Sequence, residues 1–161
     1  MSTADDRIQW LGTYIPYLIY RITGHLNRKL RKNLKRSGIN LARWRVLAVL
    51  QNHGALNIGQ IAEHTLIEQP TVSRVVDQLQ REGLAVRESS GVDSRFVHVL
   101  LTDMGKSAFK KIYPIAVRHQ EQALLGFDEE EIKTLTGFLE RIQANISSHP
   151  LPVPGKGGDS V

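Results

Sequence analysis

The chain has 161 residues and no cysteine, which suits one ordinary domain and excludes thiolate zinc sites, iron–sulfur clusters and cysteine nucleophiles. Apolar residues make up 41% and charged residues 23%, as in globular proteins, and no apolar run approaches the roughly 20 residues that span a bilayer. The net charge is +5, and the segment from Arg21 to Arg45 holds nine Lys or Arg residues without one Asp or Glu, a field that attracts polyanions such as nucleic acid.

The first two predicted elements are helices. One is expected from about Ile8 to Arg36, where apolar residues recur at spacings of three and four. Pro16 lies inside it and is expected to mark a kink or a late start. Gly38 then ends the helix, because glycine adopts the left-handed conformation that closes a helix end. The second helix is expected from Leu41 to about Asn52.

A short helix and an amphipathic helix are expected next. Asn57 and Gln60 form a capping-box pattern at the start of a two-turn helix that runs to about His64. After a turn, Pro70 fits the first position of another helix. Within Thr71–Glu82, four apolar residues fall on one face of a helix with 3.6 residues per turn. They are Val72, Val75, Val76 and Leu79.

The pattern then changes to that of β-strands. Two runs, Leu84–Glu88 and Phe96–Leu101, are separated by a loop rich in turn-forming residues, which predicts a hairpin. Thr102 is placed to cap a fifth helix that runs to about Leu125. Pro114 lies in its interior, so we expect a kink there.

The final helix is expected to begin at a second capping box, formed by Asp128 and Glu131. Its apolar residues recur at alternating spacings of three and four, which gives a seam that can pair with another helix. Residues 149–161 are rich in proline and glycine and are expected to be a disordered tail.

The polar face of the Thr71–Glu82 helix suits a nucleic acid. Its outward side chains carry the hydrogen-bond donors and acceptors that base edges and phosphates require. They are those of Thr71, Ser73, Arg74 and Gln78. Free backbone N–H groups at the helix N-terminus are expected to add phosphate contacts. In the hairpin loop, Arg95 can reach a minor groove and Asp93 can hold its guanidinium. The alternative is that these helices and the hairpin are only packing units.

Five stretches together resemble the DNA-binding core of the multiple antibiotic resistance regulator (MarR) family. They are Ile58–Ala62, Thr71–Leu79, Glu82–Arg87, an Asp-x-Arg pattern at Asp93-Ser94-Arg95, and a Leu-Thr-x-x-Gly pattern at Leu101–Gly105. The resemblance covers about residues 8–148 and implies a mainly α fold with a small β-wing. The implied architecture is a winged helix-turn-helix at residues 37–101, flanked by dimerisation helices at residues 1–36 and 102–148, with the tail at 149–161.

The resemblance also implies a function. It points to a DNA-binding transcriptional regulator, expected to be a ligand-responsive repressor, that binds a pseudo-palindromic operator as a homodimer. The recognition helix, about Gln69 to Glu82, is expected to enter the major groove, with the wing at the minor groove. The candidate DNA-binding residues are Gln69, Pro70, Thr71, Ser73, Arg74, Gln78, Arg81, Asp93, Ser94 and Arg95.

Members of the family commonly bind a small anionic or aromatic ligand between the dimerisation helices and the winged domain. The candidates for such a site are Tyr14, Tyr17, Arg21, His25, Arg43 and Trp44. Aromatic rings and guanidinium groups suit an aromatic acid, and the basic run Arg28–Arg36 could bind a coenzyme A thioester or the DNA backbone. The alternative is that the aromatic residues belong to the core or an interface and the arginines bind phosphates.

Neither an enzyme, a cofactor nor a metal site is expected. The carboxylates at 128–131 are explained by a helix start, no phosphate-binding loop is present, and the six histidines lack the spacing of metal ligands. A membrane-surface or partner-binding role for the basic first helix is the alternative to DNA binding. The first residues, Met-Ser-Thr-Ala-Asp-Asp, lack the apolar stretch of a signal peptide, so we expect a cytoplasmic protein.

Overall fold

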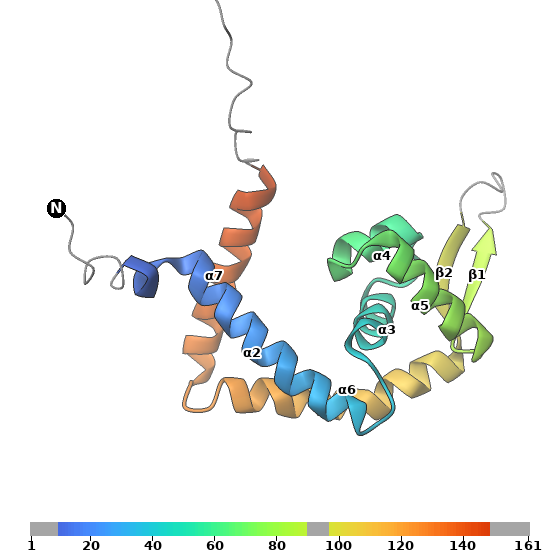
Figure 1. Ribbon diagram of the computed structural model, residues 1–161, viewed down its shortest axis with the longest axis horizontal. Helices are drawn as coiled ribbons and strands as arrows, with labels where there is room; N and C mark the ends of the chain where they lie inside the picture. Colours follow the sequence, from blue (N-terminus) through green and yellow to red (C-terminus); the bar gives the residue numbers. More distant parts are fainter. Residues whose placement is uncertain (1–9, 90–96, 149–161) are drawn as a thin grey trace, which may run out of the picture. The chain divides into compact units, whose positions relative to one another are not determined.

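The computed structural model describes residues 10–89 and 97–148, and the chain divides into two units, Met1–Ala123 and Leu124–Val161. The elements of the first unit are α2 (Ile15–Lys35), α3 (Leu41–His53), α4 (Ile58–Thr65), α5 (Gln69–Arg81), β1 (Ala85–Ser89), β2 (Val97–Leu101) and α6 (Asp103–Ala123) (Figure 1). The second unit contains α7 (Glu129–Ser148). The described residues are mainly helical with a small hairpin, as predicted. The predicted tail at 149–161 lies outside them.

The first helix starts later than its apolar pattern indicated. Residues 10–13 form a separate helical turn, and Tyr14 adopts an extended conformation (φ −74°, ψ 100°) before α2 begins. Pro16 falls in the first turn of α2, where its missing N–H has no helical partner to lose. Of the two outcomes expected at Pro16, the structure shows the late start.

Both predicted capping boxes are confirmed. At α4, Gln60 N–H donates to Asn57 Oδ1 and Asn57 N–H donates to Gln60 Oε1, each at 2.9 Å. At α7, the equivalent bonds join Asp128 and Glu131 at 2.8 and 2.9 Å. These side chains satisfy backbone donors that have no partner within the helix, so four residues of local sequence are enough to fix each helix start.

The turn between α4 and α5 contains an unusual leucine. Leu66 has φ 53° and ψ 38°, the left-handed region, and its side chain is 91% exposed. Its backbone N–H donates to the Ala62 and Glu63 carbonyls, which closes α4. The position therefore needs a left-handed backbone, and the leucine side chain gains almost nothing from burial in return.

Replacing Leu66 by asparagine is expected to stabilise the protein by about 0.5–1 kcal/mol. A left-handed conformation costs an ordinary L-residue roughly 1–2 kcal/mol, and asparagine tolerates it better. Thermal or urea unfolding measures the gain. Leu66→Ala is the matched control, since it removes the exposed apolar group but keeps the backbone penalty. An alanine variant that gains as much as the asparagine variant would show that strain is not the cause.

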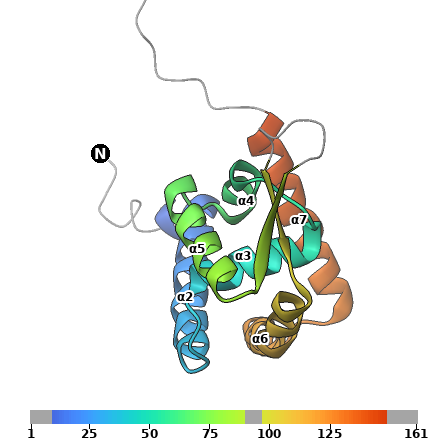
Figure 2. The same ribbon diagram turned by 90° about the vertical axis from the view of Figure 1, so that its right-hand side faces the viewer.

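The first unit packs around α3, which lies at its centre and contacts α2, α4, α5, α6 and β2 (Figure 2). The two strands pair antiparallel, with Val86 opposite Leu100. Leu56, in the loop before α4, extends this pairing: its N–H donates to Val99 O at 3.1 Å and its carbonyl accepts Val99 N–H at 2.7 Å. The middle of β2 is therefore hydrogen-bonded to the segment that leads into α4.

A close contact fixes the start of α6 against the turn between α5 and β1. Thr102 Oγ1 donates to Gly83 O at 2.6 Å and accepts Gly105 N–H at 3.0 Å, so the predicted cap is confirmed. Gly105 lies so near the turn that an added Cβ would be 1.9 Å from Leu84 O. Beyond this contact, α6 continues as one helix through Pro114.

The second unit presents apolar side chains that its own residues do not bury. Phe138, Leu139 and Ile146 of α7 are all exposed, and Ile146 is 70% accessible. None of the helices in residues 10–89 and 97–148 combines the length and apolar content of a membrane-spanning segment.

Candidate nucleic-acid interface

Helix α5 has the two faces that its sequence predicted. Its four apolar residues, Val72, Val75, Val76 and Leu79, are all buried in the core. On the other side, the exposed candidates are Gln69, Pro70, Arg74, Gln78 and Arg81, whereas Thr71 and Ser73 are half-buried. The apolar face anchors the helix, so its polar face is presented to solvent on a rigid support.

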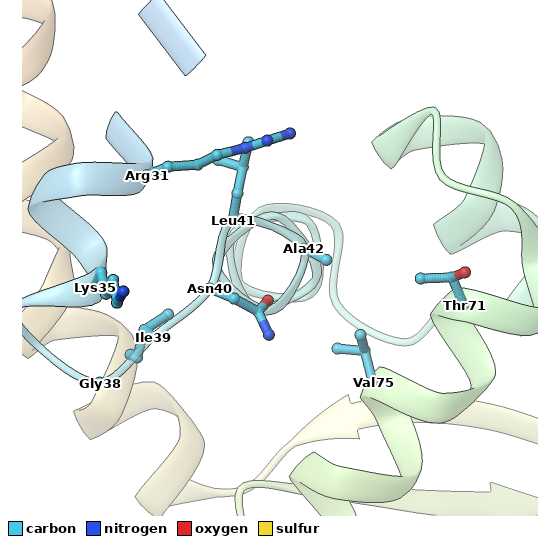
Figure 3. Close-up of a pocket in the computed structure, with 9 residues that line it drawn as sticks. All are labelled: Arg31, Lys35, Gly38, Ile39, Asn40, Leu41, Ala42, Thr71 and Val75. Atoms are coloured by element: carbon cyan, nitrogen blue, oxygen red, sulfur yellow. The ribbon is translucent and has the colours of Figure 1, made fainter. Parts of the chain in front are cut away.

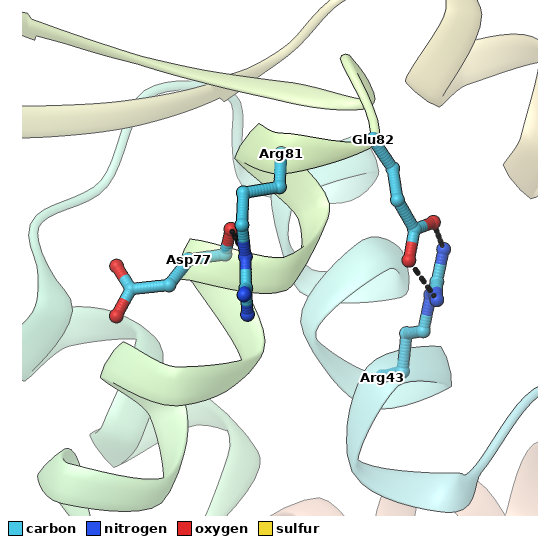
Figure 4. A network of polar contacts seen from close by, with 4 residues as sticks. All are labelled: Arg43, Asp77, Arg81 and Glu82. Carbon is cyan, nitrogen blue, oxygen red and sulfur yellow. Dashed lines mark hydrogen bonds and ion pairs between the residues drawn. The ribbon is translucent and has the colours of Figure 1, made fainter.

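Two arginines from neighbouring elements neutralise the carboxylates of α5 and its C-cap. In α3, Arg43 makes a bidentate contact with Glu82: Nη1 donates to Oε1 at 2.8 Å and Nη2 donates to Oε2 (Figure 4). In β1, Arg87 pairs with Asp77 at 2.6 Å and donates to Gln80 Oε1 at 2.7 Å. Helix α5 is thereby linked by charge to α3 and to the hairpin.

The consequence of these pairs is a positive outer face. Because Asp77 and Glu82 are neutralised, the remaining charge on α5 is that of Arg74 and Arg81. Arg81 Nε donates to the Asp77 carbonyl oxygen at 3.3 Å, and Arg74 has no ion-pair partner among the residues that the structure describes. Such a surface suits phosphate and the guanine edge, which guanidinium groups bind in bidentate fashion.

The N-terminus of α5 offers less to a phosphate than we expected. Pro70 has no N–H, and the N–H groups of Thr71 and Val72 both donate to the Glu68 carbonyl at 3.0 Å. Glu68 is also the N-cap residue, and it contributes a carboxylate instead of a capping hydroxyl. The N–H groups of Thr71 and Val72 are thus already engaged, so this helix end offers fewer free N–H groups than predicted, and we expect side chains to supply most of the phosphate contacts.

The wing is described at its base only. Strands β1 and β2 flank the predicted loop and pair in register from Ala85–Leu101 to Ser89–Val97. Asp93, Ser94 and Arg95 lie outside the described residues. Their assignment to DNA therefore stays a prediction.

The candidate effector residues on α2 and before it form separate contacts. Tyr14 stacks on Trp10 with ring centroids 4.9 Å apart. The guanidinium of Arg21 lies over the Tyr17 ring, 5.8 Å from its centroid. His25 is exposed. These pairs are local to the helix and do not outline a cavity.

The two candidates on α3 have partners of their own. Arg43 is engaged by Glu82, and Trp44 is buried with its ring parallel to that of Phe109, at 5.4 Å between centroids. This arrangement agrees with the alternative reading of Trp44 as a core residue.

A cavity of about 740 Å³ lies between the end of α2, the start of α3 and α5 (Figure 3). Its lining residues are Arg31, Lys35, Gly38, Ile39, Asn40, Leu41, Ala42, Thr71 and Val75. Two cations on α2 thus face an apolar wall and two residues of α5. Sequence reasoning selected none of these residues for an effector site: Thr71 was a candidate DNA contact and Val75 a core residue, and the only signal for a ligand here was the charge density of the Arg28–Arg36 run.

Two histidines that are distant in sequence meet in space. His53 at the end of α3 and His64 in α4 stack with ring centroids 4.2 Å apart. Within the described part of the chain, no three His, Asp or Glu side chains gather as a metal site requires.

Comparison with known proteins identifies the family. A model of the MarR family matches residues 37–95. The crystal structure of a MarR-family transcriptional regulator from Silicibacter pomeroyi is 33% identical, with a TM-score of 0.78 over 88% of this chain and 95% of that one. The HTH-type transcriptional regulator YkoM of Bacillus subtilis (strain 168), an uncharacterised protein, is 33% identical over 74% of this chain and 77% of the relative. The chain belongs to the MarR family.

Membership in the MarR family makes the chain a DNA-binding transcriptional regulator with a winged helix-turn-helix, and not an enzyme. A third relative, BpsR of Bordetella bronchiseptica, shares the fold at 22% identity, with a TM-score of 0.70 over 81% of this chain and 94% of that one. That structure concerns the regulation of DNA binding by 6-hydroxynicotinic acid. In this MarR-family chain, α4 and α5 form the helix-turn-helix, and β1 and β2 form the wing.

Proposed function

We propose that the chain is a ligand-responsive repressor that binds a pseudo-palindromic operator as a homodimer, with α5 in the major groove and the wing at the minor groove. Residues 37–101 bind DNA, and residues 1–36 and 102–148 form the dimer. One observation carries the proposal: α5 is anchored by its valine face, its acids are neutralised, and Arg74 is exposed and has no ion-pair partner among the described residues. Because its partner is DNA, the proposed location is the cytoplasm.

The dimer is supported by apolar surface in both units. On α2, Ile15, Tyr20 and Ile22 are each more than half exposed. On α7, the exposed Phe138, Leu139 and Ile146 form a second uncovered set. Apolar surface of this extent on a folded chain marks an association site, and a two-fold axis lets one copy cover the same surface of the other. Light scattering should give twice the 18.1 kDa of the chain.

Replacing Arg74 by alanine is expected to weaken binding to the cognate operator about tenfold and to reduce discrimination between operator and unrelated duplex. The guanidinium is exposed on the outer face of α5 and has no ion-pair partner in the part of the chain that the structure describes, and its loss is expected to remove both a phosphate contact and a base-edge contact. Fluorescence anisotropy with a duplex taken from the DNA beside the gene measures the affinity at fixed salt.

The matched control is Lys110→Ala, which removes the same charge from an exposed position of α6. It is expected to change the affinity for operator and for unrelated duplex little and equally. If Arg74→Ala and Lys110→Ala change the affinities for operator and for unrelated duplex by the same factors, α5 does not determine sequence discrimination. Binding to anionic vesicles without binding to duplex would favour the membrane-surface alternative instead.

The proposed effector site is the 740 Å³ cavity between α2, α3 and α5, a volume within the range of small-molecule sites. Arg31 and Lys35 supply cations for a carboxylate, and Leu41 and Val75 supply apolar walls. Since Thr71 and Val75 belong to α5, a ligand here contacts the recognition helix itself. Its proposed class is a small aromatic or anionic molecule or its coenzyme A thioester, and the ligand-dependent DNA binding of BpsR supports this regulation.

Arg31→Gln is expected to weaken the binding of an aromatic acid about tenfold, because one of the two cations of the cavity is lost. Calorimetric titration with benzoate and with benzoyl-coenzyme A measures the affinity and compares the two ligand classes. Arg28→Gln is the matched control, because Arg28 is exposed on the same helix and does not line the cavity. Equal affinities in the two variants would place the ligand elsewhere.

A further inference from the structure

A second cavity lies between the end of α2 and the C-terminal half of α6. Its volume is about 360 Å³, at the lower end of the range for small-molecule sites. Its lining residues are Asn33, Arg36, Ser37, Ile115, Arg118, His119 and Gln122. It shares no residue with the cavity beside α5, and it is lined by polar side chains with one apolar wall, Ile115. This makes it a separate candidate site.

The charged side chains that line this cavity are both positive. Arg36 comes from the C-cap of α2 and Arg118 from α6, and no carboxylate lines the cavity. Within residues 10–89 and 97–148, neither arginine has an ion-pair partner. Two guanidinium groups at one cavity repel each other, and a bound oxyanion removes that repulsion. The planar donor fork of arginine also matches the geometry of carboxylate and phosphate oxygens.

The third basic group is held in a defined orientation. His119 Nε2 lies 3.0 Å from the backbone oxygen of Leu26 in α2. A carbonyl oxygen only accepts hydrogen bonds, so Nε2 carries a hydrogen and donates it. The Asn33 and Gln122 amides and the Ser37 hydroxyl add further donors around the cavity. The His119 ring is thus held by the α2 backbone beside two arginines that are exposed to solvent and have no ion-pair partner among the described residues, so a ligand from solution can reach both guanidinium groups.

We propose that this cavity binds a small organic oxyanion, a carboxylate or a phosphate ester. The charged group lies between Arg36 and Arg118, and the organic part lies against Ile115. Because the arginines belong to different helices, the ligand bridges α2 and α6. The site shares no residue with the proposed operator contacts of α5 or with the effector cavity, so it gives the protein a second ligand-binding site.

The test uses calorimetric titration of the full-length protein with phenyl phosphate, benzoate and uncharged benzamide at constant ionic strength. We expect an anion to bind and benzamide not to, and the tighter anion identifies the charged group. Arg118→Gln should weaken that binding about tenfold. Because benzoate is also the probe for the cavity beside α5, the effect of Arg118→Gln is measured in the Arg31→Gln background, in which binding at that other cavity is already weakened. Arg28→Gln, which lines neither cavity, should leave anion binding unchanged. An affinity that is the same with and without Arg118→Gln overturns the proposal.

The imidazole NMR signals of His119, assigned with His119→Gln, provide a local readout that does not depend on stability. They should shift on addition of the anion, and an unchanged signal at saturation overturns the proposal. Arg74→Ala should bind the anion as the wild type does, so failure of operator binding and failure of this site are distinguishable. If Arg118→Gln weakens duplex binding but not anion binding, the cavity belongs to the DNA surface and the proposal is wrong.

Discussion

Gly105→Ala is expected to destabilise the protein by about 3 kcal/mol or more. An added Cβ would lie 1.9 Å from Leu84 O and 3.0 Å from Leu84 C, which are backbone atoms. That backbone is fixed on both sides, because Leu84 O accepts Thr102 N–H at 3.1 Å and Leu84 N–H donates to Leu79 O at 2.8 Å. Relief of the clash therefore requires breaking hydrogen bonds at the start of α6. Urea unfolding followed by circular dichroism measures the loss.

Gly137→Ala is the matched control for this substitution. Gly137 lies in α7, and nothing lies within 4 Å of its added Cβ. Alanine is the better helix former, so this variant should gain about 0.5–1 kcal/mol. Opposite signs at the two glycines are the expected result. A gain of stability in both variants would show that the turn between α5 and β1 adjusts to the Cβ of Gly105→Ala at little cost.

Glu82→Arg is expected to cost about 2–3 kcal/mol of stability and to weaken operator binding as well. The change replaces a bidentate ion pair with two guanidinium groups. Solvent screens part of the effect, because the Glu82 side chain is 47% exposed, but that of Arg43 is only 17% exposed. Arg43 Nε is buried and has no hydrogen-bond partner within residues 10–89 and 97–148, so the guanidinium depends on Glu82 for compensation of its burial. Urea unfolding and fluorescence anisotropy with the operator measure the two effects.

The exchange of both charges tests whether the pair itself is responsible. Combining Arg43→Glu with Glu82→Arg should recover more than half of the lost stability and of the lost operator affinity. Glu140→Arg, on an exposed position of α7, makes the same charge change away from any such pair and should be nearly neutral. A double variant no more stable than Glu82→Arg alone would show that the two charges are not coupled.

Elements fixed by neighbouring residues could be predicted from the sequence. The capping boxes at Asn57 and Asp128 set the starts of α4 and α7, because donor and acceptor are three residues apart. The apolar spacing of α5 predicted its buried face, since helical periodicity converts sequence positions directly into directions. Strand β2, Val97–Leu101, lies within the run Phe96–Leu101 that was predicted to be a strand, and Phe96 lies outside the described residues.

Contacts between distant residues could not be predicted. Arg43 and Glu82 are 39 positions apart, and no local pattern assigns one to the other. The stacking of His53 on His64 and the two cavities likewise depend on how helices pack. Leu66 gives no local signal either, because leucine is an improbable residue for a left-handed turn. The sequence therefore predicted α5 better than it predicted the long-range contacts that hold α5 in place.

The contact between α6 and the α5–β1 turn decides which parts of the first unit move together. Thr102 and Gly105 bind the first turn of α6 to that turn, so the recognition helix, the hairpin base and the start of α6 have to shift as one body. Further along, Pro114 has no N–H for the Lys110 carbonyl and leaves its turn one hydrogen bond short, so we expect α6 to bend most easily there. We therefore expect the flexibility of α6 at Pro114 to set how far the helix-turn-helix moves relative to the C-terminal half of α6.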